Sequence, residues 1–210
     1  MKTTLVRSLQ LAATLGASAL SAIAAPSSFD FKDPKGVNNV QFKLDAPLES
    51  ISGSGSGITG AVEFDPANPA VTRGRIVLDA ASLVVGNPLM VEHLHGAHWL
   101  DVAQHPSIVF EATKLTNVRS QGAQIVADAS GKLTVKGVTK ELTVPVTLTY
   151  LADKLGARLG DEKIKGDLLV LRANFEINRS DFGIQPGQNT DKVAETIHLS
   201  LSIAGAAPRS

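Results

Sequence analysis

From residue 38 onward, apolar side chains recur at every second position, and this alternation constrains the fold more than any other feature of the sequence. Successive side chains of a strand point to opposite faces, so a period of two predicts strands with one buried and one solvated face. Gly, Pro, Asn and Asp separate the alternating segments, which favours turns between about eight strands. The clearest segments are Val40–Leu44, Ile76–Leu78, Ile108–Ala112, Leu133–Val135, Leu142–Tyr150, Leu169–Ile177 and Ile197–Ile203.

Eight such strands form either a sandwich of two packed sheets or one closed antiparallel barrel. Closure removes unpaired edges, but alternation alone leaves both architectures open. The chain has seven Phe, one Tyr and one Trp, and many inward positions carry Val, Ala or Gly. Because small inward side chains leave room inside an eight-stranded barrel, the composition favours an enclosed space over a core filled by aliphatic residues.

One segment breaks the period of two. Pro88–Leu100 has apolar residues at helical spacing, and Pro88 stands where helices prefer to begin. We expect a short helix or a pair of turns there, lying across one end of the barrel. Residues 152–165 are charged, contain glycine and are predicted to form a hairpin loop.

The first residues predict a secretory signal peptide, residues 1–24. Lys2 and Arg7 precede the uncharged run Leu9–Leu20, and Ala22–Ala24 has the A-x-A form of a cleavage site. The run is too short and too rich in Ala and Ser for a membrane anchor. We therefore expect cleavage after Ala24, a periplasmic location, and one mature domain, residues 25–210, without a transmembrane segment.

Composition excludes several classes of function. The chain has no cysteine, which rules out a lipid-attached cysteine, a disulfide, a thiol nucleophile and a cysteine zinc site. Lys and Arg (20) balance Asp and Glu (20) and are scattered, so no nucleic-acid partner is predicted. There is no G-x-S-x-G elbow and no recognisable acid–base pair of carboxylates, so the sequence does not predict an enzyme.

Two glycine-containing segments resemble nucleotide-binding motifs without their context. Gly55–Val62 matches a kinase glycine loop or a dinucleotide fingerprint, and Asp181–Gly183 matches a kinase metal-binding triplet. No catalytic loop stands between them, and strand rather than helix follows the glycines. Gly53, Gly55 and Gly57 instead fall on one face of a strand, where a missing side chain permits a bend, a bulge or close approach of another group.

Four histidines within thirteen residues raise a second possibility: His93, His95, His98 and His105. Clustered imidazoles are typical ligands of zinc, copper and nickel. On a helix His95 and His98 share a face, whereas His93 does not join them easily, and no carboxylate completes a known motif. A metal-binding protein or metal-dependent enzyme using these residues is therefore the alternative hypothesis.

Four segments, taken in order, resemble the YceI-like family of periplasmic lipid- or polyisoprenoid-binding proteins. The first is Gly60–Asp65, similar to a "G-x-(apolar)-x-F-D" strand end. The second is His93–Val102 with His105–Phe110, similar to "H-L-x-S-x-x-F-F-D-V-x-x-(Y/H)-P-x-I-x-F". The third is Leu133–Lys140, similar to "L-T-I-(K/R)-G-V-T-K", and the last is Asn178–Ile184, similar to "R-x-D-F-G". The resemblance covers residues 38–204.

The resemblance implies an extended lipocalin-like barrel with a long apolar tunnel, which binds, carries or stores a polyisoprenoid or fatty lipid without catalysis and without another cofactor. Arg179, Asp181 and Gly183 would then fix a corner of the barrel. A homodimer and an interaction module with a filled interior stay open. The candidate tunnel-lining residues are Phe42, Leu44, Ile76, Leu78, Phe110, Val135, Val144, Leu171, Phe175, Leu199 and Leu201.

Overall fold

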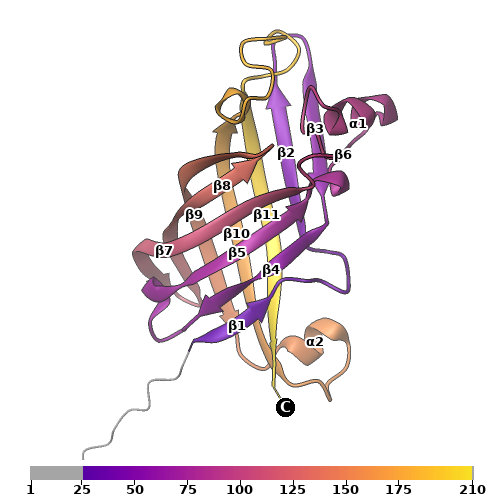
Figure 1. Ribbon diagram of the computed structural model, residues 1–210. Helices are drawn as coiled ribbons and strands as arrows, with labels where there is room; N and C mark the ends of the chain where they lie inside the picture. Colours follow the sequence, from indigo (N-terminus) through magenta and orange to yellow (C-terminus); the bar gives the residue numbers. More distant parts are fainter. Residues whose placement is uncertain (1–25, 210) are drawn as a thin grey trace, which may run out of the picture.

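The computed structural model describes residues 26–209, so the predicted signal peptide lies outside the described residues. Strands dominate, and two short helices lie at opposite ends (Figure 1). The helices are α1 (Pro88–His95) and α2 (Leu155–Leu159). The strands are β1 (Ser27–Asp30), β2 (Asn39–Asp45), β3 (Ser50–Gly55), β4 (Ile58–Phe64), β5 (Arg73–Asp79), β6 (Val84–Val85), β7 (Ser107–Gln121), β8 (Gln124–Val135), β9 (Val138–Leu151), β10 (Gly166–Asn178) and β11 (Thr196–Pro208).

Eight strands form a closed antiparallel ring in the order β1-β4-β5-β7-β8-β9-β10-β11. The ring closes because β1 pairs with β4 along its whole length and with β11 through Asp30 opposite Ala206. The predicted all-β barrel is confirmed, and the two-sheet sandwich is wrong. The strand that completes the ring, β1, is too short to show alternation.

Three further strands lengthen the wall toward α1. Where β11 runs past β1, it pairs with β2 instead, over His198–Ser202. β3 pairs with β2, and β6 pairs with β3 through Gly53 opposite Val85. As Figure 1 shows, the long strands β10 and β11 span the molecule from the α2 end to the loop beside α1. The barrel is therefore extended in one direction.

The interior divides into two apolar clusters. The cluster toward α2 contains three fully buried phenylalanines, Phe29, Phe31 and Phe64, and Phe29 packs edge-on against Phe64 and Tyr150, with ring centroids 6.2 and 6.3 Å away. The cluster toward α1 is built from the other ends of β2, β7, β8, β10 and β11 and from the turns after α1. Aromatic rings fill cross-section efficiently, so the half near α2 is closed by the protein's own side chains.

Local sequence explains where α1 begins and where α2 ends. The side chain of Asn87 accepts a hydrogen bond from the Leu89 amide, and Pro88 occupies the first turn, so α1 begins as predicted within residues 88–100. The expected loop over residues 152–165 is wrong in detail. It holds α2, which Gly160 ends with a left-handed φ of 78°.

A buried carboxylate, Asp167, ties the segment after β11 to the end of β9 at the α2 end of the barrel. Asp167 accepts hydrogen bonds from the Tyr150 hydroxyl (2.8 Å) and the Asp153 amide (2.9 Å) and pairs with Arg209 (2.9 Å). Burial opposes the charged form of Asp167, but these donors outweigh it and hold the pKa below its usual 3.8. Burial and the same carboxylate raise the pKa of Tyr150 above 10.0.

We expect Asp167→Asn to lower the free energy of unfolding by about 1–3 kcal/mol at neutral pH, because it removes a charge-assisted acceptor from a buried network. A depressed folded-state pKa contributes stability above the unfolded pKa, and this contribution is lost as pH falls through the folded value. The gap between wild type and Asp167→Asn should therefore shrink below pH 3.8.

Urea unfolding at a series of pH values measures this difference. The matched control is Asp181→Asn, which changes an exposed carboxylate and should follow wild type at every pH. A gap between wild type and Asp167→Asn that stays constant through acid pH would contradict the assignment.

Candidate functional site

A cavity of about 610 Å³ occupies the half of the barrel toward α1. Its walls come from β2–β8, β10 and β11, and α1 with the turns after it covers one side. The lining is predominantly aliphatic and aromatic, with polar side chains confined to a few positions: Glu49, His93, Arg179, Asn189 and Lys192. Concave, mostly apolar spaces of this size are typical of small-molecule binding sites.

Nine of the eleven predicted tunnel residues line this cavity: Phe42, Leu44, Ile76, Leu78, Phe110, Val135, Phe175, Leu199 and Leu201. The other two do not. Val144 and Leu171 point inward as expected, but they belong to the cluster packed around Phe29 and Tyr150. The cavity therefore extends less far along the barrel than a tunnel lined by all eleven residues would.

Exposure differs between some inward residues of the two halves, although Leu133 and Val135 of the cavity wall are also buried. In the packed half, Leu148 is 1% and Leu169 0% exposed, although Leu171 is only partly buried. Leu78, Phe110 and Leu199 point inward from equivalent strand positions and are only partly buried. Side chains in a filled core touch neighbours on every side, so partial exposure of inward residues marks a space that the protein itself does not fill.

Two glycines shape the wall as expected. The Phe42 ring lies over Gly53, where a Cβ atom would come within 2.3 Å of the ring, and Gly55 faces Leu83 and Leu78. Close approach of a neighbouring group therefore explains both positions. Phe42 also lines the cavity.

Arg179 holds the loop that closes the wall beside α1. It is 1% exposed, and its guanidinium donates to the carbonyl oxygens of Ile184 (2.9 Å), Ala194 (3.2 Å) and Val193 (3.3 Å). It also donates to the carbonyls of Gln185 and Gln188, and Glu195 lies 3.8 Å from Nε. A buried guanidinium with this many acceptors is a structural anchor.

Gly183 and Asp181 are the other two motif residues at this corner. Gly183 has a left-handed φ of 68° and ends the 3₁₀ turn Arg179–Phe182. Asp181 is exposed. The guanidinium of Arg179 also lies 6.0 Å from the centre of the Trp99 ring, which lines the cavity, so the corner and the cavity wall are in contact. Arg179 and Gly183 thus have the structural roles expected of them.

The four histidines have separate surroundings. His95 Nε2 lies 2.8 Å from the Leu83 carbonyl oxygen, His105 packs on Gly137, His93 lines the cavity, and His98 is exposed. Across residues 26–209, no three His, Cys, Asp or Glu side chains lie close enough together to hold a metal ion. The geometry therefore gives the metal hypothesis no support.

Alternation did not identify the part of the wall that comes from outside the long strands. Ile51 lies on the glycine-rich β3, Val85 on the two-residue β6, Met90 on α1 and Val193 on the loop before β11. None of these segments has a strand pattern. The helical spacing of Pro88–Leu100 and the resemblance of His93–Val102 to a family motif were the signals that pointed to this side.

Together, the fold and the cavity define an antiparallel β-barrel protein with an apolar interior site open to a ligand. The sequence profile of the YceI-like domain matches residues 31–204. The chain therefore belongs to the YceI-like family, as its motifs indicate.

Related proteins and solved structures resemble this chain in sequence or in fold. A UPF0312 protein of Pseudomonas savastanoi pv. phaseolicola is 29% identical over 197 residues, covering 92% of this chain and 94% of its own. Burkholderia cenocepacia BcnA has a similar fold, with a TM-score of 0.65 at 22% identity over 80% of this chain and 95% of its own. A polyisoprenoid-binding domain from Saccharophagus degradans, implicated in plant cell wall breakdown, gives a TM-score of 0.63 at 11% identity over 87% and 99%.

No helix among residues 26–209 has the length and apolar character needed to cross a bilayer.

Because one half of the interior is filled and the other is hollow, two similar substitutions should lower the free energy of unfolding by different amounts. Leu148→Ala should lower the free energy of unfolding by about 2–5 kcal/mol, because it opens a void in a filled core. Leu78→Ala should cost only about 1–2 kcal/mol, because this side chain already borders open space. Denaturant unfolding of the ligand-free protein measures both. Equal costs at the two positions would contradict the division.

Proposed function

We propose that this protein binds a long-chain apolar lipid, of the polyisoprenoid class, in the α1 half of its barrel and carries or stores it without catalysis. One observation carries the proposal: the cavity of about 610 Å³ is lined almost entirely by aliphatic and aromatic side chains. A hydrocarbon chain gains about 0.8 kcal/mol for each methylene removed from water. Such a cavity can hold a chain without a charged anchor.

Family membership and one structural neighbour support the class of ligand. The Saccharophagus degradans domain of similar fold is described as polyisoprenoid-binding. At 11% identity the likeness is one of fold, so the ligand class rests on the cavity's own chemistry. Branched isoprene units suit a lining rich in Leu, Ile and Phe, because short branches pack into the gaps between such side chains.

A periplasmic location is part of the proposal. It rests on the residues before the barrel: the positive start, the uncharged run and the A-x-A site of residues 1–24. Cleavage after Ala24 would release a protein that begins just before β1. Fractionation of cells that express the full chain, with mass measurement of the product, tests both the location and the cleavage site.

The direct test of the ligand is extraction. Protein purified without detergent and extracted with organic solvent should release a long-chain isoprenoid in stoichiometric amount, identified by mass spectrometry. Release of a transition metal without lipid would instead favour the metal hypothesis. A protein that yields neither, and that binds no added isoprenoid, would refute the carrier proposal.

Adjacent valines of β6 offer a matched pair of variants. Val85 lines the cavity, whereas Val84 is 47% exposed. We expect Val85→Phe to weaken isoprenoid binding about tenfold, because the added ring takes volume from the chain, and Val84→Phe to leave it unchanged. Trp99, the single tryptophan, lines the cavity and reports binding through its fluorescence. Equal affinity of the two variants would place the ligand elsewhere.

A further inference from the structure

The ladder between β9 and β10 stops halfway along the barrel. The two strands pair from Leu168 opposite Leu151 to Ala173 opposite Val146, and no further. Each continues to pair on its other side, β9 with β8 as far as Val138 and β10 with β11 as far as Asn178. The wall therefore contains a gap, here called the β9–β10 window.

Pro145 explains where the window begins. It is the residue of β9 next to Val146, the last residue paired with β10. Proline has no N–H to donate, so strands accept it only at positions that need no ladder bond. Pro145 keeps its register with Asp128 of β8, which leaves the β10 side as the one where pairing ends.

The window lies beside an outer groove that shares lining residues with the cavity. An outer groove of about 900 Å³ crosses β9, β10, β11, β2 and β3, and Leu142 and Phe175 are among its lining residues. Both belong to the inward set that packs against the apolar clusters. Phe175 also lines the cavity. The groove therefore reaches inward-pointing apolar side chains at the level where the hollow half meets the packed half.

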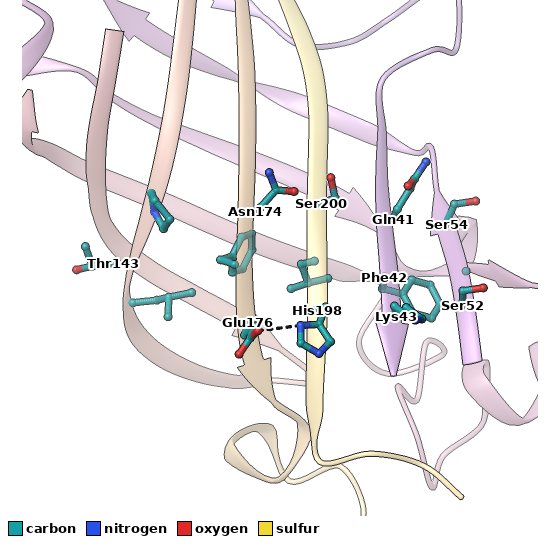
Figure 2. A pocket seen from close by; sticks show the side chains of 15 residues that line it. Gln41, Phe42, Lys43, Ser52, Ser54, Thr143, Asn174, Glu176, His198 and Ser200 are labelled. Atoms are coloured by element: carbon teal, nitrogen blue, oxygen red, sulfur yellow. Dashed lines mark ion pairs between the residues drawn. The ribbon is translucent and has the colours of Figure 1, made fainter. Parts of the chain in front are cut away.

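The groove carries polar side chains beside its apolar ones, and its charged side chains lie next to partners. Figure 2 shows the ion pair between Glu176 and His198, whose atoms lie 2.8 Å apart, and Lys43 pairs with Asp45 at 2.6 Å. Around them lie amide and hydroxyl side chains: Gln41, Ser52, Ser54, Thr143, Asn174 and Ser200 (Figure 2). Amides and hydroxyls both donate and accept hydrogen bonds, which suits an uncharged polar group.

We propose that the β9–β10 window is a side entrance to the cavity for neutral amphiphiles. The apolar tail passes between Leu142 and Phe175 into the hollow half, and the uncharged hydroxyl- or carbonyl-bearing head remains in the outer groove. This rests on the proposed function, since the cavity must accept the tail. It adds where the ligand enters and which head group is preferred.

The absence of cysteine from the chain permits a site-specific test. A single Thr143→Cys variant, labelled with an environment-sensitive fluorophore, reports on the window. Thr149→Cys, on the same strand but opposite Val170 in the paired stretch, is the matched control. Geranylgeraniol should shift the emission of the label at 143 and leave the label at 149 unchanged. Geranylgeranyl phosphate should bind about tenfold more weakly, because the groove leaves its charge unpaired.

A second variant closes the window. Pro145→Val restores an N–H and should extend the β9–β10 ladder, so it should slow the association of geranylgeraniol about tenfold in stopped-flow measurements of Trp99 fluorescence. If Trp99 responds while the labels at 143 and 149 behave alike and Pro145→Val binds at the wild-type rate, the side entrance is refuted and the carrier function stands. If Trp99 responds to no isoprenoid, the carrier function itself is refuted.

Discussion

The distribution of large side chains inside the barrel determines the rest of the structure. An eight-stranded barrel has an interior that side chains can just fill, and here they fill only one half. Phe29, Phe64 and Tyr150 pack against one another near α2, where Leu148 and Leu169 are fully buried. Toward α1 the inward residues are mostly aliphatic, and they surround a space that they do not fill. The packed half supplies stability, and the open half is left for a ligand.

Because the α1 half is apolar, polar groups near it must lie outside the cavity or have hydrogen-bond partners in its wall. Arg179 illustrates this: it is buried next to Trp99, yet its donors are directed to the carbonyl groups of the loop before β11. An unpaired guanidinium there would carry a large desolvation cost and would recruit an anion. Because these carbonyl groups engage its donors, Arg179 fixes the loop before β11 and leaves the cavity chemically suited to hydrocarbon.

Much of this arrangement follows from sequence, and the exceptions have physical reasons. Alternation located the long strands and nine cavity residues, because one face of each strand must be apolar. It placed Val144 and Leu171 in the tunnel because periodicity shows which way a side chain points and not what fills the space opposite it. It could not reveal β1, which is four residues long, or the wall contributed by β6 and α1. The effect of Pro145 depends on a neighbouring strand, which periodicity does not identify.

A crystal structure of the lipid-free protein under xenon pressure would show whether the α1 half is hollow, since xenon enters dry apolar cavities and leaves filled cores empty. We expect xenon among Leu78, Phe110 and Leu199 and none around Leu148 and Leu169. Side chains collapsed across the α1 half with no xenon there, or xenon held equally in both halves, would contradict this expectation.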